Sequence, residues 1–464
     1  MFIDQGYIEG LLADAAGATV ATKTAAVEKT ERGERLNHAD IATLLYVDEP
    51  DLMARLYAVA GEIKRKIYGN RIVLFAPLYV SNHCVNNCVY CGYQRCNAMP
   101  RKKLTREEIQ AEVRALERMG HKRLALEAGE DPVNCPIEYI LEALDAIYET
   151  KLDNGSIRRV NVNIAATTVE EYRMLHDKGI GTYILFQETY HKPTYEAMHP
   201  HCRKSSYEYH LTAFDRAMEA GIEDVGAGVL FGLADPRYEA LALMMHNDHL
   251  EQTYGVGFHT ISMPRLKQAE GMSLADFPNL VDDETFRHLV AILRIAVPYT
   301  GIIMATRERA AMRDELLRYG VSQVSAGSST GIGGYHEQEE ATAQGRRVNT
   351  DQFELSDERR PLEVIKDLIE NGYIPSYCTA CYRQGRTGDR FMALARSGEI
   401  QNVCTPNALL TLQEYMLDYG DAELNDMGSK LIEREVAAIT DGRLRATVQD
   451  KLKRMRAGER DLFL

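Results

Sequence analysis

The residues best suited to metal chemistry in this sequence are three closely spaced cysteines. Cys84, Cys88 and Cys91 are spaced C-x3-C-x2-C and follow an apolar run from Ile72 to Val80. Thiolates are soft ligands that bind zinc, Cu(I) or iron–sulfur clusters, and a structural zinc ion normally takes four protein ligands. Three thiolates on a four-iron cluster leave one iron open to a further ligand. The spacing therefore favours an open 4Fe–4S cluster, with a zinc site completed by His83 or a closed structural cluster as the alternatives.

The residue before the last cysteine, Tyr90, gives this loop the pattern C-x3-C-x-aromatic-C. The pattern resembles the cluster loop of radical SAM enzymes. The resemblance implies that the open iron chelates the amino and carboxylate groups of S-adenosylmethionine (SAM) and passes it one electron. A carbon–sulfur bond then breaks and a 5'-deoxyadenosyl radical forms. The cofactors expected from this resemblance are a SAM-binding 4Fe–4S cluster and SAM itself.

Length and composition narrow the class of protein that carries these cysteines. The chain has 464 residues and a net charge of −14, from 54 Lys and Arg against 68 Asp and Glu. The negative charge argues against a nucleic-acid surface. No apolar run is long enough to span a bilayer, and the first residues lack the basic and apolar regions of a signal peptide. We therefore expect a cytoplasmic protein with no nucleic-acid or membrane partner, whose clustered cysteines are reduced metal ligands.

Short apolar runs alternate with amphipathic segments from residue 71 onward, which is typical of strand–helix units. The eight runs are Ile72–Val80, Arg123–Ala128, Arg159–Ile164, Thr182–Phe186, Asp224–Phe231, Gly257–Met263, Gly301–Ala305 and Val321–Ser325. Helix starts and ends are indicated by Thr105-x-x-Glu108, Thr168-x-x-Glu171, Gly120, Gly179 and Gly221. Eight such units predict an α/β fold, a (β/α)8 TIM barrel with its chemistry at the C-terminal ends of the strands. The cysteine loop follows its own strand at that end.

Both ends of the chain extend beyond the predicted barrel. Residues 1–70 show helical spacing after Pro50, with a helix end near Gly69, and predict a helical N-terminal extension. Composition changes near residue 345, and apolar residues then recur at helical spacing from Leu362 to Ile369. We therefore expect three parts: the extension at 1–70, a radical SAM barrel at 71–345 and a helical C-terminal iron–sulfur domain at 346–464.

Two other predicted strand ends carry residues that resemble SAM-binding positions of radical SAM enzymes. The second strand runs into Gly129 and Glu130, where a glycine lets the backbone approach a ligand and a carboxylate accepts hydrogen bonds from an ammonium group. The fourth run leads to Glu188, expected on the ribose hydroxyls of SAM, and then to Arg203 and Lys204, either of which suits its carboxylate. An ordinary polar loop is the alternative for each segment, above all for the two basic residues.

Several further segments resemble the aromatic amino acid lyases of the radical SAM superfamily, over roughly residues 71 to 340. They are Gln187-Glu-Thr-Tyr190, Tyr195-x-x-x-His199-Pro200, Ile261-Ser-Met-Pro-Arg265, Ala305-Thr-Arg-Glu308 and Ser325-Ala-Gly-Ser-Ser-Thr-Gly-Ile-Gly-Gly-Tyr335. The resemblance implies that Arg307 holds the substrate carboxylate, which suits a guanidinium fork, and that Ser325 assists. Tyr93 is expected to line the substrate pocket. The alternatives are a surface charge at a helix start for Arg307 and ordinary packing for Tyr93.

A second set of cysteines lies beyond the barrel. Cys378, Cys381 and Cys404 are spaced C-x2-C-x22-C, no cysteine follows them, and the last histidine of the chain is His336. A structural zinc site would therefore lack a nearby fourth ligand in the sequence. This spacing on such an extension resembles the HydG family, the maturases of [FeFe]-hydrogenase. The related ThiH family of thiazole biosynthesis is expected to lack it.

The resemblance to the HydG family implies a second 4Fe–4S cluster with an additional labile iron, held by a barrel histidine that matches His259. His259 lies four residues before the end of its predicted strand, Gly257–Met263, and therefore about 13 Å below the mouth of the barrel. This places the two clusters at opposite ends of one barrel. Since a TIM barrel is normally filled, a small product would need a lined channel between them. The alternative for a lone histidine on an apolar strand is a core residue.

The predicted function is that of a radical SAM lyase acting on tyrosine. The resemblance implies cleavage of the Cα–Cβ bond to p-cresol and dehydroglycine, which is converted to carbon monoxide and cyanide on iron for assembly of the [FeFe]-hydrogenase active site. The implied partners are tyrosine, a low-potential electron donor and other hydrogenase maturation proteins. The alternatives are a ThiH-type 2-iminoacetate synthase for thiazole biosynthesis and, from another class, a non-enzymatic iron–sulfur scaffold.

Overall fold

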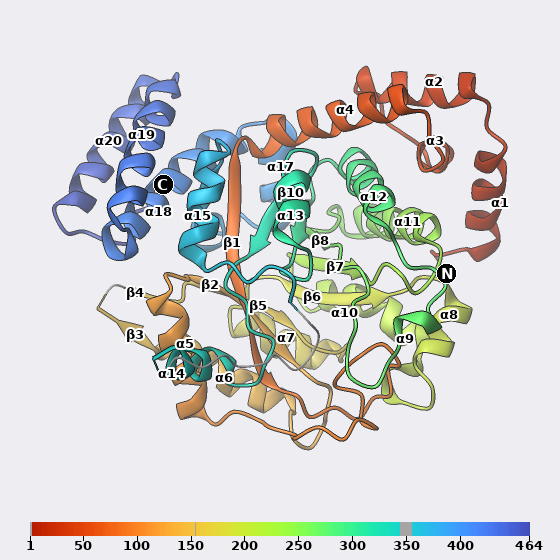
Figure 1. Ribbon diagram of the computed structural model, residues 1–464, viewed down its shortest axis with the longest axis horizontal. Coiled ribbons are helices and arrows are strands. Elements are labelled where there is room, and N and C mark those ends of the chain that lie inside the picture. The colour runs from red at the N-terminus through yellow and green to blue at the C-terminus, as the bar shows by residue number, and fades with distance from the viewer. Residues whose placement is uncertain (1, 154, 344–354) are drawn as a thin grey trace.

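Four helices form the N-terminal part of the chain in the computed structural model, which describes residues 2–153, 155–343 and 355–464 (Figure 1). They are α1 (Gln5–Ala16), α2 (Val20–Glu31), α3 (His38–Leu44) and α4 (Pro50–Tyr68). Pro50 starts α4, where a missing N–H costs no hydrogen bond, and Gly69 ends it with a φ of 60°. The helical N-terminal extension predicted from the sequence is confirmed.

Eight parallel strands close into a barrel at the centre of the molecule (Figure 1). They are β1 (Arg71–Ser81), β2 (Arg123–Ala128), β5 (Arg159–Asn163), β6 (Tyr183–Glu188), β7 (Val225–Val229), β8 (Thr260–Ser262), β9 (Gly301–Met304) and β10 (Val321–Ser325). The barrel closes between β10 and β1, where Gln323 lies opposite Val73. Each of the eight predicted runs overlaps one of these strands, so the predicted (β/α)8 barrel is confirmed.

Strand β8, next to the candidate metal ligand His259, is shorter than predicted. β8 begins at Thr260, so His259 precedes the strand and the prediction that it lies within it is wrong. The side chain of Asn247 is the reason, because its Oδ1 accepts the N–H of Phe258 at 2.8 Å in place of a neighbouring strand. The N–H of His259 still donates to the carbonyl of Val225 at 2.9 Å, which fixes its backbone against β7.

Helices surround the barrel, and the helix starts and ends that the sequence indicated are present. In chain order they are α5 (Arg106–Arg118), α6 (Ile137–Glu149), α7 (Val169–Asp177), α8 (Lys192–Met198), η1 (Arg203–Ser205), α9 (Tyr207–Leu211), α10 (Ala213–Glu219), α11 (Pro236–Tyr254), η2 (Leu274–Asp276), α12 (Asp283–Ala296), α13 (Ala310–Leu316) and α14 (Gly334–Ala343). Thr105 and Glu108 form both hydrogen bonds of a capping box, and Thr168 accepts the N–H of Glu171. The predicted C-terminal glycines, Gly120, Gly179 and Gly221, all have positive φ.

The C-terminal part is mainly helical but also contributes a strand to the barrel wall. Its elements are α15 (Pro361–Glu370), β11 (Ile374–Ser376), α16 (Ala380–Arg383), α17 (Gly388–Ser397), α18 (Ile400–Tyr419), α19 (Ala422–Ala438) and α20 (Gly442–Arg456). β11 pairs in parallel with the start of β1, Ile374 opposite Arg71, and was not predicted. The predicted boundary at 345/346 lies outside the described residues. Figure 1 shows α18 to α20 on one side of the barrel and α1 to α3 on the other.

Two small features complete the description. A short antiparallel pair, β3 (Lys151–Leu152) and β4 (Gly155–Ser156), lies between α6 and β5. No helix among the described residues is long and apolar enough to cross a bilayer.

Candidate active site with two cysteine clusters

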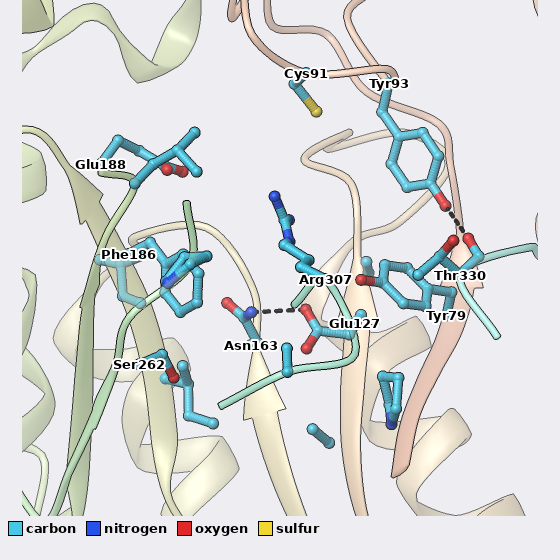
Figure 2. Close-up of a pocket in the computed structure, with 18 of the residues that line it drawn as sticks. Tyr79, Cys91, Tyr93, Glu127, Asn163, Phe186, Glu188, Ser262, Arg307 and Thr330 are labelled. Carbon is cyan, nitrogen blue, oxygen red and sulfur yellow. Dashed lines mark hydrogen bonds between the residues drawn. The ribbon is translucent and has the colours of Figure 1, made fainter. Parts of the chain in front are cut away.

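A cavity of about 260 Å³ opens at the C-terminal ends of the strands, and we call it the mouth cavity (Figure 2). Nine residues predicted from the sequence line it: Cys84, Cys88, Cys91, Tyr93, Gly129, Glu130, Glu188, Arg307 and Ser325. They come from different strand ends and from the loops that follow them. The fold therefore gathers the cysteine loop, the candidate SAM-binding residues and the candidate substrate-binding residues around one space.

The loop between β1 and α5 carries the first cysteine trio. Its backbone is tied to the next strand, since the N–H of Val85 donates to the carbonyl of Glu130 at 2.8 Å. Burial raises the pKa of the Cys88 thiol, and it raises the pKa of Cys91 to about 11. These thiols are therefore protonated at neutral pH until a metal displaces their protons. Buried cysteines that face a cavity suit a metal cluster better than free surface thiols do.

Gly129 and Glu130 lie against this loop. A Cβ on Gly129 would stand 2.3 Å from the carbonyl oxygen of His83, so only glycine fits there. The Glu130 carboxylate accepts a hydrogen bond from Asn86 Nδ2 at 2.6 Å and pairs with Arg203 Nε at 2.7 Å. The Arg203 side chain is 60 % exposed, and it reaches the cavity only through this carboxylate.

Glu188 and Lys204 form an ion pair inside the mouth cavity. Lys204 Nζ lies 2.8 Å from Glu188 Oε1 and 3.4 Å from the Tyr90 hydroxyl. Burial disfavours the charge of Lys204, but Glu188, Cys88 and Tyr195 together outweigh this effect and raise its pKa. Glu188 has a φ of 67°, at a shift in the pairing of β6 with β7. Of the two basic residues considered from the sequence, Lys204 is the one that lines the cavity.

Arg307 occupies the middle of the mouth cavity in the loop after β9 (Figure 2). Burial lowers its pKa, while Tyr79 and Glu188 act in the opposite direction. The preceding residue is fixed by Ser325, whose Oγ accepts the N–H of Thr306 at 3.2 Å. Ser325 therefore holds the backbone that presents Arg307.

Tyr93 lies on the wall of the mouth cavity above Arg307 (Figure 2). Its hydroxyl donates a hydrogen bond to the carbonyl of Thr330 at 2.9 Å. The ring also packs edge-on against Tyr79, with centroids 6.3 Å apart. Tyr93 thus joins the cysteine loop to the segment after β10 and lines the same space as Arg307.

A second cavity, of about 60 Å³, lies at the N-terminal ends of the strands, and we call it the lower cavity. Its lining includes Cys378, Cys381, Cys404, His259, Arg71, Arg123 and Arg159. The three arginines are the first residues of β1, β2 and β5, which places this cavity at the opposite end of the barrel from the mouth. β11 and α18 bring the cysteines there, because β11 extends the sheet beside β1 and α18 packs on β11.

Positive charge surrounds the thiols of the lower cavity. A hydrogen bond with Cys381 lowers the pKa of Cys404, and Arg71 acts in the same direction. Arg123 Nη1 donates to the carbonyl of Cys378 at 3.0 Å. Burial raises the pKa of Cys378, and Arg71 and Arg123 act against this rise, so the guanidinium groups favour thiolates once a metal displaces the protons.

His259 faces the same cysteines with a buried ring. Its Nδ1 has no hydrogen-bond partner among the described residues and lies 3.4 Å from Asp224 Oδ1. Burial lowers its pKa, so the imidazole is neutral at neutral pH. A neutral, buried imidazole beside three thiols is the form that ligates a metal.

Gln323 on β10 lines both cavities. A Cβ on the neighbouring Gly301 would stand 2.7 Å from Gln323 Nε2, so the small residue makes room for the amide. The two cavities therefore meet at this level at a polar side chain, for which Gly301 leaves room. This arrangement agrees with the expectation of two sites at opposite ends joined through the interior.

The chain resembles known proteins at the level of families and of whole chains. The model of the radical SAM superfamily matches residues 78–241, and that of the biotin and thiamin synthesis associated domain matches residues 262–374. The 2-iminoacetate synthase of Escherichia coli (strain K12) is 30% identical over 355 residues, which is 76% of this chain and 90% of that protein. These matches cover the barrel and place its chemistry in the radical SAM superfamily.

Similarity to solved structures extends over the C-terminal part of the chain as well. A crystal structure of HydG, a maturase of the [FeFe]-hydrogenase, has a TM-score of 0.95 and 54% identity over 100% of both chains. The chain belongs to the HydG family. A second HydG structure, from Carboxydothermus hydrogenoformans, has a TM-score of 0.84 and 38% identity over 96% of this chain and 97% of that one. The prediction that this chain resembles the HydG family is confirmed.

As a member of the HydG family, the chain is a radical SAM enzyme that uses a 4Fe–4S cluster and SAM. The mouth cavity fits both, because buried cysteines, the close approach at Gly129 and the charged pair of Glu188 and Lys204 surround one space. Among the described residues, no three His, Cys, Asp or Glu side chains are arranged around a single metal ion. Thiolates of a cluster bind different irons and stand further apart, so this result agrees with a cluster.

Sequence reasoning missed three residues at the floor of this HydG-family cavity. Tyr79, Glu127 and Asn163 lie directly opposite one another on β1, β2 and β5. Asn163 Nδ2 donates to Glu127 Oε2 at 2.6 Å (Figure 2). Burial raises the pKa of Glu127 to about 8. The available signal was a carboxylate inside the apolar run Arg123–Ala128, two residues before Gly129.

Replacing Gly129 with alanine tests the close approach at the cysteine loop. The added methyl group collides with the His83 carbonyl, so the loop must shift, at a cost of about 1–3 kcal/mol. We expect the Gly129→Ala variant to fold but to bind less iron and SAM after anaerobic reconstitution, measured by iron analysis and by equilibrium dialysis. Gly10→Ala in α1 is the matched control, since its Cβ would meet nothing within 4 Å and its φ is not positive. Normal iron and SAM binding by Gly129→Ala would contradict the assigned contact.

Proposed function

We propose that this protein is a radical SAM tyrosine lyase that supplies carbon monoxide and cyanide for the [FeFe]-hydrogenase active site. Cleavage of the Cα–Cβ bond of tyrosine gives p-cresol and dehydroglycine, and dehydroglycine yields the two diatomic products at the lower cavity. The observation that supports this proposal most is the placement of two cysteine trios at opposite ends of one barrel, with Arg307 in the mouth cavity.

Residues at the mouth are assigned to the cluster and to SAM. Cys84, Cys88 and Cys91 hold the cluster, which with bound SAM supplies a 5'-deoxyadenosyl radical. Glu130 accepts hydrogen bonds from the SAM ammonium group, and Arg203 positions Glu130 from the rim. Glu188 accepts hydrogen bonds from the ribose hydroxyls, and its partner Lys204 lies within reach of the SAM carboxylate.

Tyrosine is assigned to the remaining part of the mouth cavity. Arg307 binds its carboxylate through two parallel hydrogen bonds, which fixes both position and orientation. Ser325 holds the Arg307 loop, and Tyr93 lines the space beside the substrate. Orientation and exclusion of water are the main contributions of these residues, because a primary carbon radical reacts with any group it meets.

The lower cavity is assigned to a second 4Fe–4S cluster and to an iron that leaves as cargo. Cys378, Cys381 and Cys404 hold the cluster, and His259 holds the additional iron through its neutral ring. Arg71 and Arg123 balance the negative charge of the thiolates. The iron with its diatomic ligands is the product that other hydrogenase maturation proteins receive in the cytoplasm, and a low-potential donor supplies the electrons.

Two rival functions differ from this one in a single feature each. A 2-iminoacetate synthase shares the barrel, and its 30% identity over 355 residues supports a common radical step. It does not account for the cysteines and arginines of the lower cavity. A non-enzymatic iron–sulfur scaffold would not need the SAM-facing residues Gly129 and Glu130.

Turnover of the anaerobically reconstituted protein separates these functions. With SAM, dithionite and tyrosine we expect 5'-deoxyadenosine, p-cresol and carbon monoxide, and with tryptophan at least about tenfold less 5'-deoxyadenosine. The products are measured by chromatography and by trapping carbon monoxide on deoxymyoglobin. Tyrosine cleavage without carbon monoxide would favour the synthase. Absence of 5'-deoxyadenosine with either amino acid would favour the scaffold.

A further inference from the structure

Glu127 is a carboxyl group at the floor of the mouth cavity to which the proposed function gives no role. It lies on β2 between Tyr79 of β1 and Asn163 of β5, in direct register with both. Asn163 holds it through a 2.6 Å hydrogen bond to Oε2, and the group lines the cavity below Arg307 in the view of Figure 2. A carboxyl group held rigidly in a substrate cavity is suited to bind a positively charged group of a ligand.

Arg307 determines which part of an amino acid lies next to Glu127. Arg307 is near enough to Glu127 to oppose the rise in the pKa of Glu127 that burial causes. It is also near enough to Cys91 for that thiol to affect the pKa of Arg307. The carboxylate and the ammonium group of an α-amino acid are attached to the same Cα atom. A substrate carboxylate on Arg307 therefore keeps the ammonium group close to the guanidinium, where Glu127 is a carboxyl group that can receive it.

We propose that Glu127 binds the α-ammonium group of the substrate and accepts one proton from it. The inference rests on the proposed function, in which the substrate is an amino acid held by Arg307. The ammonium group becomes a neutral amine, and the carboxylate becomes a carboxylic acid held by Asn163. No oxidant or reductant takes part in this step. Arg307 and Glu127 together then select zwitterionic amino acids over simple carboxylic acids.

The charged and titratable groups around Glu127 agree with this role. Arg307 faces it from the loop after β9, Tyr79 from β1 and Tyr335 from α14. The pKa values of both tyrosines are raised, chiefly by burial, so they stay neutral. Burial raises the pKa of Glu127 to about 8 in spite of Arg307 and Asn163. A carboxyl group that is neutral below this pH must lose its proton to bind an ammonium ion, and tyrosine affinity therefore rises with pH up to about pH 8.

Ligand selectivity measured without turnover tests the proposal. Reconstituted protein with SAM and no reductant is titrated by calorimetry with tyrosine and with 3-(4-hydroxyphenyl)propanoate, which lacks the amino group. We expect the wild type to prefer tyrosine by about 10- to 100-fold, the value of a hydrogen bond to a charged group. Glu127→Gln keeps a partner for Asn163 but lacks the carboxylate, so its preference falls to about threefold or less. Affinity for the propanoate stays unchanged.

The pH series and a control variant separate binding from a structural effect. Wild-type affinity for tyrosine rises between pH 6.5 and 8, by at most about tenfold per unit, and affinity of Glu127→Gln stays flat. Glu142→Gln makes the same change on the exposed face of α6, outside the mouth cavity, and keeps the full preference for tyrosine. An unchanged preference in Glu127→Gln would overturn the proposal. The proposal would also be overturned if Glu127→Gln lost only a preference for tyrosine over phenylalanine, titrated in the same way. That result would place Glu127 at the phenol. If the wild type itself fails to bind tyrosine, the proposed function fails before any variant is compared.

Discussion

The double variant Cys378→Ala, Cys381→Ala is expected to keep forming p-cresol within about threefold of the wild type, because changes at distant sites act nearly independently. Carbon monoxide should fall at least about a hundredfold, since the cluster that the lower cavity holds is lost. The two cavities lie at opposite ends of the barrel, and the mouth cavity contains none of the changed residues. Both products are measured in the same anaerobic reaction.

Cys96→Ala is the matched control for this variant. Cys96 is exposed and lies outside both cavities, so its removal should leave both products unchanged. Loss of p-cresol and carbon monoxide to the same extent in the double variant would show that the two cavities do not divide the reaction. Iron analysis of the double variant should show that about half of the cluster iron is retained.

Replacing Arg307 is expected to have the largest effect on tyrosine cleavage. Lysine keeps the charge but not the two parallel hydrogen bonds, and alanine removes both. Loss of a buried hydrogen-bonded charge costs about 3 kcal/mol, which corresponds to a fall of about a hundredfold in kcat/KM for p-cresol formation. We expect about this loss for Arg307→Lys and a larger one for Arg307→Ala. SAM binding, measured by equilibrium dialysis, should be unchanged.

Arg309→Lys is the control for Arg307, since it changes the same residue type two positions further along the loop. Arg309 is 59% exposed and pairs with Asp283 outside the mouth cavity. Its replacement should leave kcat/KM within about twofold, as for most surface changes. If Arg307→Lys behaves like this control, the substrate carboxylate is held elsewhere.

The sequence was sufficient for the parts of this protein that depend on local patterns. Eight apolar runs, capping residues such as Thr105 and Thr168, and glycines at helix ends predicted the barrel because hydrophobic spacing and helix termini are properties of neighbouring residues. The cysteine spacings predicted two metal sites for the same reason. Motifs along the barrel, read as a resemblance, indicated Arg307, and the spacing of the C-terminal cysteines indicated the HydG family before any geometry was known.

Residue positions that depend on contacts between distant segments were harder to predict from the sequence. Arg203 and Lys204 are neighbours in sequence, but the fold turns Lys204 toward Glu188 in the cavity and Arg203 toward Glu130 at the rim. His259 was expected within a longer strand, and the Asn247 side chain from α11 delays that strand to Thr260. In both cases a contact made by another element decides the outcome.

What the sequence alone determined was the set of chemical groups: two cysteine trios, the residues of a SAM site and an arginine for a carboxylate. The tertiary structure decided which groups meet. β11 joins β1 and carries Cys378 to the N-terminal end of the barrel, and strand register places Glu127 between Tyr79 and Asn163. These arrangements arise from hydrogen bonds between strands far apart in the chain, and no local pattern encodes them.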